Sequence, residues 1–415
     1  MSSPRRPRRV SRRFLAAPRA AVALVVVVSA ALAGALATPA STAVLTNPTG
    51  CVHGYRRGLD YFPDKATVGD AQNFTVTYHG SYKVLTVKVP FPGGSPQTYV
   101  LVQCGTPAPR LTGALAGAEV VSVPVRSLFA ESTTELIPLV EIGETKALHG
   151  VGSEQYVYAK AVRQRFKDPG FVEFARSGAV DVERVLGAKP DVLLTAGTDS
   201  PAYAKLREAG LPVVAVAEYL EPSPLGQAEW AKLIATLFNQ ERRSQSVYSA
   251  VASAYRRLAA LSASAPPSRR PLVMTGFEDS GTFYEKGGQS LTARLIADAG
   301  ATSVWADNPE RGPIMIDLEA ELGRAARADV WIDGSQFWGS LADAQKDDPR
   351  YQGFRPFQTH QVWVPNRVKN ANGGLDFFER GDARPDLVLA DLIKVFHPDR
   401  LRDHHLVFYV RLPQR

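Results

Sequence analysis

The chain has 415 residues, of which 45% are hydrophobic, and it contains two cysteines. This length and composition indicate a globular protein of two or three domains and exclude collagen, coiled coils and small disulfide-rich scaffolds. The formal net charge is +7, but seven arginines and no acidic residue lie in the first 37 positions. The remaining 41 positive and 41 negative charges balance. A neutral body lacks the basic surface that nucleic-acid binding needs, so we expect no nucleic-acid partner.

The amino-terminal segment has the layout of a secretory signal peptide. An arginine-rich start is followed by Ala, Val and Leu from residue 20 to residue 37, where small residues suit cleavage. We therefore expect residues 1–37 to be a signal peptide. The mature protein would be exported, to the periplasm or the outer face of the cytoplasmic membrane. An uncleaved membrane anchor is the alternative, because an apolar stretch of this length nearly spans a bilayer.

The two cysteines, Cys51 and Cys104, lie after this segment. In an exported chain, two thiols more often form a disulfide than stay free, so we expect these two to be joined. The alternative for Cys51 is a lipid anchor, because the small residue Gly50 precedes it as in lipoproteins. Such an anchor would attach the protein directly to the membrane.

The mature chain begins with β-rich sequence. Residues 73–103 form short alternating runs separated by prolines and glycines at positions 90–94, which predicts a β-meander. From residue 119 onward, short apolar strands alternate with helices, with strands near 119–125, 191–195 and 213–216. Strands that are apolar on both faces belong in a parallel sheet covered by helices. We call residues 51–238, including the meander, the first lobe.

A long amphipathic helix is predicted next. Asn239 can cap it, and Val247, Val251 and Leu258 lie on one apolar stripe. We expect residues 239–264 to form this interlobe helix and residues 271–415, with strands near 272–275, 330–332 and 362–364, to form a second lobe. The predicted fold class is α/β, with two Rossmann-like lobes joined by a single long helix and a small β-meander at the N-terminus.

One sequence pattern occurs once in each lobe. In the first lobe, Asp181-Val-Glu183 begins a helix that leads through Leu-Gly to an Asp-Val strand at residues 191–194. In the second lobe, Asp317-Leu-Glu319 leads in the same way to residues 329–332. The recurrence indicates pseudo-repeated lobes with Glu183 and Glu319 at matching exposed helix starts. The alternative is coincidence between two common helix–strand units.

The sequence lacks the motifs of several enzyme classes. It has no Gly-x-Ser-x-Gly elbow, no P-loop, no Gly-x-Gly-x-x-Gly and no His-Glu-x-x-His. The adjacent His404 and His405 would point to opposite faces of a strand, so we interpret them as exposed tail residues rather than a metal pair. We expect no catalysis and no cofactor. A secreted enzyme on an α/β scaffold is the alternative from another class.

Aromatic and polar side chains gather in segments expected to follow strands. Ligands of α/β proteins bind at the carboxyl ends of strands, and a cleft between two lobes offers such ends from both sides. This predicts a cleft for a bulky, partly apolar ligand. The candidate ligand-binding residues are Tyr156, Thr198, Tyr219, Phe277, Tyr284, Trp305, Trp338, Arg367, Asn370 and Asn372.

Several sequence blocks, in their order, resemble substrate-binding proteins of the cobalamin/ferric-siderophore type, which are receptors of ABC importers. The blocks are residues 132–136, 181–183, 189–193, 210–214, 229–230, 237–239, 305–307, 348–351, 370–374, 384–393 and 396–398. The resemblance covers nearly the whole mature chain. It implies two α/β lobes joined by one helix, a ligand cleft between them, and small lobe movements on binding.

The resemblance also implies partners. The ligand would be an iron-siderophore or other metal chelate, and cobalamin or haem is the alternative within the class. Because a chelator already coordinates its iron, the receptor needs no metal ligands of its own, whereas a bare-metal receptor would need a cluster of His and carboxylates. Aromatic rings and the donors Arg367, Asn370 and Asn372 would hold the chelate. Glu183 and Glu319 would dock on arginines of the permease, which a monomeric receptor contacts at the membrane.

Overall fold

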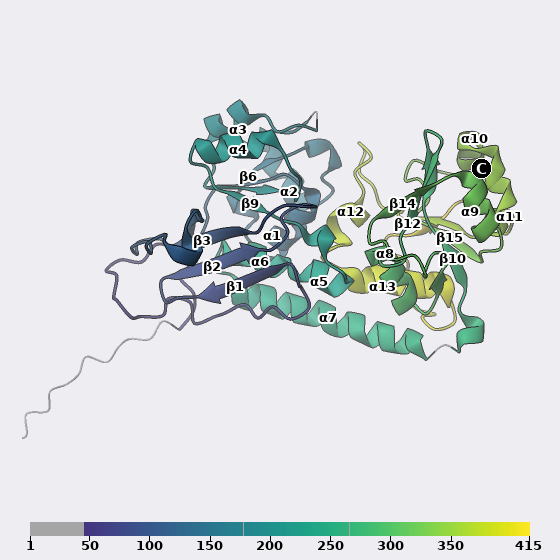
Figure 1. The fold of residues 1–415 in the computed structure, drawn as a ribbon, viewed down its shortest axis with the longest axis horizontal. Helices are drawn as coiled ribbons and strands as arrows, with labels where there is room; N and C mark the ends of the chain where they lie inside the picture. The colour runs from purple at the N-terminus through teal and green to yellow at the C-terminus, as the bar shows by residue number, and fades with distance from the viewer. Residues whose placement is uncertain (1–44, 177, 265) are drawn as a thin grey trace, which may run out of the picture. The chain divides into compact units, whose positions relative to one another are not determined.

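The computed structural model describes residues 45–415 except residues 177 and 265. The predicted signal peptide at residues 1–37 lies outside the described residues. Between residues 45 and 415, none of the described helices is both long and apolar enough to cross a membrane. The helices and strands of this part are drawn in Figure 1.

The predicted β-meander is present as a four-stranded front sheet. Its strands are β1 (Phe74–Tyr78), β2 (Tyr82–Val87), β3 (Gln97–Gln103) and β4 (Glu119–Val123). The first three strands pair antiparallel in sequence order, and β4 joins β3 in parallel. The sequence interpretation placed residues 119–125 in the parallel sheet of the first lobe, and this is wrong. Val121 and Val123 of β4 are buried while Val120 is exposed, so the strand covers the core with one face only.

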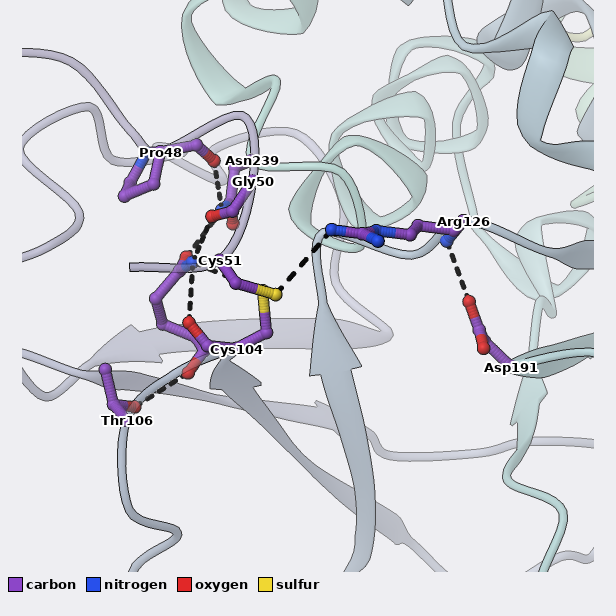
Figure 2. The surroundings of a disulfide bond; sticks show 9 residues. Pro48, Gly50, Cys51, Cys104, Thr106, Arg126, Asp191 and Asn239 are labelled. Atoms are coloured by element: carbon purple, nitrogen blue, oxygen red, sulfur yellow. Dashed lines mark hydrogen bonds between the residues drawn. A yellow bond between two sulfur atoms is a disulfide. The ribbon is translucent and has the colours of Figure 1, made fainter. Parts of the chain in front are cut away.

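A disulfide between Cys51 and Cys104 ties the start of the described chain to the end of β3, as expected (Figure 2). The backbone N–H of Val52 donates to the Cys104 carbonyl at 2.9 Å, and the Gln103 amide donates to the Gly50 carbonyl at 2.8 Å. Because the sulfur of Cys51 is bonded to that of Cys104, it is not free to carry a lipid in this structure.

The first lobe contains a parallel five-stranded sheet with the order β7-β6-β5-β8-β9. Its strands are short and largely buried, as expected for a sheet covered on both faces. The strands are β5 (Leu128–Ala130), β6 (Leu148–Val151), β7 (Val172–Glu173), β8 (Val192–Thr195) and β9 (Val213–Ala215), and the helices are α1 (Leu136–Ile142), α2 (Lys160–Arg163), α3 (Val182–Ala188), α4 (Pro201–Glu208), α5 (Pro224–Glu229) and α6 (Ala231–Thr236).

The predicted interlobe helix is α7 (Glu241–Ala263), which has 23 residues and is therefore about 35 Å long (Figure 1). Its cap differs from the prediction. Asn239 has a positive φ of 59°, and its side-chain amide donates to the Gln103 side chain, so it does not cap the helix. The N-cap position belongs to Gln240. The buried stripe of α7, which includes Tyr248 and Tyr255, packs with residues of the second lobe in one apolar cluster.

The second lobe contains a five-stranded sheet with the order β13-β10-β15-β16-β17 and a separate three-stranded sheet with the order β11-β12-β14. The strands are β10 (Leu272–Met274), β11 (Phe277–Asp279), β12 (Thr282–Lys286), β13 (Thr302–Ser303), β14 (Pro313–Ile316), β15 (Val330–Ile332), β16 (Val362–Val364) and β17 (Val410–Arg411). The helices are α8 (Leu291–Asp298), α9 (Leu318–Ala325), α10 (Leu341–Asp347), α11 (Arg355–Gln358), α12 (Asp376–Arg380) and α13 (Pro385–Phe396).

Four strands of each five-stranded sheet share their topology. The order β6-β5-β8-β9 in the first lobe has the same connectivity as β13-β10-β15-β16 in the second, and all these neighbours are parallel. The recurring sequence pattern lies at equivalent places, because α3 precedes β8 and α9 precedes β15. Asp181 and Asp317 are the N-caps of these helices, and each accepts a hydrogen bond from the backbone three residues on. The pattern therefore marks matching elements of the two lobes.

Candidate functional site

A cavity of about 430 Å³ lies where the first lobe meets loops of the second. Residues of both lobes line it. The first lobe provides Ala130, Glu131, Ser132, Thr133, Leu136, Val151, Gly152, Ser153, Gln155, Tyr156 and Val157, and the second provides Gln336, Phe337, Asn372, Gly373, Gly374, Leu375 and Phe378.

The lining of the first lobe comes from the carboxyl ends of two adjacent strands. Residues 131–133 follow β5 and residues 152–157 follow β6, so the site lies where ligands bind in α/β sheets. Gly152 is required there, because a Cβ atom at this position would lie 2.4 Å from the Glu131 carbonyl oxygen. Ser132 and Glu135 form a capping box that fixes the turn after β5.

The lining of the second lobe is a loop held in place by Asn370. The Asn370 side-chain oxygen accepts hydrogen bonds from the backbone N–H groups of Asn372 and Gly374, at 2.8 and 2.9 Å. Its amide group donates to the carbonyls of Gln155 and Val157, at 3.0 and 2.9 Å. Asn370 therefore connects the two lobes and shapes the loop, although it does not itself line the cavity.

Three aromatic rings of the lining are strongly exposed. The exposed fractions are 84% for Phe337, 56% for Tyr156 and 48% for Phe378. Large apolar side chains at a protein surface are informative when they gather at one place. These rings provide an apolar surface that a bulky ligand would cover.

Only two of the ten predicted ligand-binding residues, Tyr156 and Asn372, line this cavity. Two other residues of the first lobe follow the next strands of the sheet, Thr198 after β8 and Tyr219 after β9. The Tyr219 hydroxyl donates to the Gly197 carbonyl at 2.7 Å, and the Thr198 hydroxyl lies 3.1 Å from the hydroxyl of Tyr203. These contacts give Tyr219 and Thr198 a local structural role.

The structure places Trp338 in the core, which corrects its assignment as a ligand-binding ring. Its exposed fraction is 1%, its indole N–H donates to Asp347 at 2.5 Å, and its ring packs against Trp331 and Tyr351. Trp331 and Tyr351 are buried as well, and the three rings fill the interior of the second lobe. A ring enclosed in this way has no face free for a ligand.

The other candidates of the second lobe also lie outside the cavity lining. Phe277 and Tyr284 pair across β11 and β12, and Phe277 packs on the core. Trp305 donates its indole N–H to Glu321 at 2.7 Å. Arg367 is exposed, and its backbone N–H donates to the Phe408 carbonyl.

Sequence reasoning missed Phe337, Phe378 and Glu131 as lining residues. The segment containing Phe337 follows β15, and this position at the end of a strand could have identified it as part of the site. The sequence does not show which of the neighbours Phe337 and Trp338 faces the cavity. Glu131 directly follows β5, where a polar residue at a strand end is the expected sign of a site.

No metal site is evident at the cavity. Among the residues that the structure describes, no group of three or more His, Cys, Asp or Glu side chains is arranged to hold a metal ion. The two adjacent histidines do not form such a site either, and His404 is not a free tail residue as predicted. It is half-buried and its ring lies 2.6 Å from the carboxylate of Asp391, while His405 is exposed.

Glu183 and Glu319 occupy the second position of α3 and of α9, and both are exposed. Their helices are capped in the same way, so the two carboxylates have equivalent local settings. They differ in one contact, because Glu319 forms an ion pair with Arg350 at 2.5 Å. Such an exposed pair contributes little to stability and is easily exchanged for another partner.

A buried carboxylate also joins the lobes. Glu379 of α12 accepts backbone hydrogen bonds from Tyr158 at 2.5 Å and from Ala159 at 3.0 Å. Its exposed fraction is 0%, and burial raises its pKa to about 7. The backbone donors and Arg163 oppose this rise, whereas the charge of Asp376 adds to it.

This raised pKa predicts a pH-dependent stability. Because the folded protein binds a proton at Glu379 more tightly than the unfolded chain does, stability is highest below the ordinary pKa and falls as pH rises to about 7. The expected loss is on the order of 2 kcal/mol. Urea unfolding measures the free energy of unfolding at about pH 5 and about pH 8. This free energy should differ less between the two pH values in Glu379→Gln than in the wild type. The exposed Glu208→Gln should retain the full difference, and an unchanged difference in Glu379→Gln would contradict the prediction.

The sequence pattern of the family described as periplasmic binding proteins matches residues 129–364, more than half of the chain. The chain belongs to this family. The members of this family are extracytoplasmic binding proteins rather than enzymes. The match confirms the resemblance to substrate-binding proteins that was inferred from the sequence. An uncharacterised lipoprotein of Methanocaldococcus jannaschii is 23% identical over 303 residues, covering 71% of this chain and 70% of the relative.

Solved structures support the fold of this periplasmic binding protein. A periplasmic haem-binding protein from Pseudomonas aeruginosa matches with a TM-score of 0.52 at 18% identity, covering 66% of this chain and 93% of the other. The CeuE protein of Helicobacter pylori, solved with Ni(II) bound, matches with a TM-score of 0.52 at 13% identity, covering 69% and 88% of the two chains. At these identities the likeness concerns the fold, and it agrees with the predicted α/β class.

Proposed function

We propose that this periplasmic binding protein is an exported receptor that binds a ferric siderophore or a similar iron complex and delivers it to an ABC importer. The observation that carries the proposal is the cavity of about 430 Å³ at the carboxyl ends of β5 and β6, with three exposed aromatic rings in its lining. A cavity of this size suits a compact chelate rather than a bare ion.

The chemistry of the lining supports a ligand that arrives with its metal already coordinated. The lining contains one carboxylate, Glu131, and otherwise aromatic, aliphatic, amide and hydroxyl side chains and glycines. A receptor for bare transition metals needs several His, Cys or carboxylate ligands around one point. The Pseudomonas relative is a haem-binding protein, and haem likewise arrives with its metal already coordinated.

Two alternatives have distinct signatures. A cobalamin or haem receptor would bind its ligand in the same cavity without converting it. A secreted α/β enzyme would convert a bound small molecule into a product, which chromatography of the ligand after incubation would detect. The proposed receptor returns its ligand unchanged.

Isothermal titration calorimetry of residues 38–415 tests the proposal directly. The panel consists of ferric hydroxamates, ferric citrate, haem and cobalamin, with the iron-free chelators as controls. Calorimetry is preferable to tryptophan fluorescence, because no tryptophan lines the cavity. Saturable binding of an iron complex, with much weaker binding of its iron-free chelator, is the expected result. No heat of binding from any iron complex would overturn the proposal.

Phe337→Ala should weaken binding of the iron complex about tenfold, because an exposed ring that becomes covered by a ligand is a typical source of binding energy. The free energy of unfolding should change little, since 84% of the Phe337 surface is exposed in the free protein. Met315→Ala is the matched control, because Met315 is 69% exposed on β14 and does not line the cavity. Equal affinities of the two variants would argue against the cavity as the binding site.

A further inference from the structure

We propose that the cavity selects iron complexes that are neutral or positively charged and rejects anionic ones, and that Glu131 sets this selectivity. The inference rests on the proposed receptor function and narrows its substrate class. It differs from the expectation drawn from the sequence, in which the cationic Arg367 would be one of the donors that hold the chelate. The structure gives Arg367 no place in the cavity lining.

The first support is the charge of the lining. Eighteen of the described residues line the cavity, and among them Glu131 is the one carboxylate, with no Lys, Arg or His. Anionic groups that leave water need compensating donors or positive charges, and without them their burial is costly. Citrate, a tricatecholate complex and the propionate groups of haem are anionic, and each would lack a counter-charge in this cavity. A neutral complex meets no such penalty.

The second support is the fixed position of the Glu131 carboxylate. Its Oε2 atom accepts a hydrogen bond from the backbone N–H of Ala196 at 3.1 Å and from the hydroxyl of Tyr203 at 2.6 Å. The side chain therefore places a negative charge at the wall of the cavity at a defined point, at the end of β5.

The surroundings do not neutralise this charge. Glu135 and Glu218 are buried behind the turn after β5, and burial raises the pKa of each carboxyl. Neither residue can supply a positive charge that would balance Glu131. Arg176 pairs with Glu173 and Arg380 pairs with Asp376, and neither arginine lines the cavity. Lys369 precedes the loop of residues 370–374 and is exposed, but it does not line the cavity.

The aromatic rings add to the same preference. Tyr156, Phe337 and Phe378 present exposed rings at a cavity that carries a carboxylate. Ring faces attract cations and repel anions, so an ammonium group attached to a chelate gains from both features. At short range and partial burial, one carboxylate–ammonium contact changes affinity by about tenfold.

The test compares complexes that share iron coordination but differ in charge. Ferrioxamine B is a ferric trihydroxamate with a free ammonium group, ferrioxamine E is its uncharged cyclic counterpart, and a ferric tricatecholate supplies the anion. Calorimetry of residues 38–415 should show ferrioxamine B binding about tenfold tighter than ferrioxamine E, and the tricatecholate at least tenfold weaker than ferrioxamine E. Glu131→Gln should remove the preference for ferrioxamine B over ferrioxamine E.

Glutamine keeps an oxygen that accepts hydrogen bonds from Ala196 and Tyr203, so Glu131→Gln removes the charge and keeps these contacts. Thermal unfolding checks that the variant is as stable as the wild type. Glu208→Gln is the control, because Glu208 is exposed at the end of α4 and is not part of the lining. Tight binding of the tricatecholate, or an unchanged preference in Glu131→Gln, would overturn the inference and leave the receptor function intact. Failure of all iron complexes to bind the wild type would instead overturn the proposed function, and the inference with it.

Discussion

Replacing Lys83 with Met should lower the free energy of unfolding by about 3–5 kcal/mol, because it leaves a buried carboxylate without its partner. Lys83 of β2 and Glu241 at the start of α7 form an ion pair at 2.5 Å, and both side chains have no exposed surface. The Lys83 ammonium also donates to the Thr236 carbonyl at 2.6 Å and to the Asn239 side chain at 2.7 Å. The pair therefore joins the front sheet to the first turn of the interlobe helix.

Lys65→Met is the matched control for this experiment. Lys65 also pairs with a carboxylate, that of Asp60, but both side chains are about half exposed, so its loss should cost less than about 1 kcal/mol. Urea unfolding followed by circular dichroism measures both variants. The double variant Lys83→Met/Glu241→Leu should recover much of the loss, because it removes both buried charges. Equal effects of Lys83→Met and Lys65→Met would contradict the burial argument.

The double variant Glu183→Arg/Glu319→Arg should abolish uptake of the iron complex through the importer while ligand binding is unchanged. We propose that these two carboxylates, at matching positions of α3 and α9, dock on arginines of the permease. Charge reversal at both sites turns two attractions into repulsions, which reduces association strongly. Neither residue lines the cavity, so affinity for the chelate should stay the same.

Uptake of radioactive iron in cells that express the importer measures this effect, and calorimetry of the purified variant measures binding. The single variant Glu319→Arg also removes the ion pair between Glu319 and Arg350. In the proposed complex, a permease arginine would take the place of Arg350 in that pair. Glu208→Arg, at an exposed site outside α3 and α9, is the control and should transport normally. Normal uptake by the double variant would remove Glu183 and Glu319 from the docking surface.

The elements that the sequence predicted are those encoded by local pattern. The spacing of apolar residues predicted the strands β8 and β15 and the amphipathic helix α7. This spacing is a property of the sequence itself and does not depend on how the chain folds. The disulfide followed from the number of cysteines and the expected compartment. β4 was placed in the wrong sheet, because its pattern shows that it is a strand but not which strand it pairs with.

The candidate site was predicted less well, because a ligand cavity depends on which side chains point outward from loops. Residue types near strand ends led to Tyr156 and Asn372, which line the cavity, and to Asn370, which holds the loop of the second lobe. The same reasoning selected Trp338 over its neighbour Phe337. Packing against Trp331 decides that Trp338 is enclosed and Phe337 is exposed.

By itself, the sequence determined that this protein has α/β lobes joined by a long helix, a β-meander and a repeated helix start at Glu183 and Glu319. Only the tertiary structure decided that Lys83 and Glu241 form a buried pair, and that Glu131 is the one charged side chain among the described residues that line the cavity. The physical reason is distance along the chain. Periodicity and capping act over a few residues, whereas burial and charge pairing depend on segments that meet only after the chain has folded.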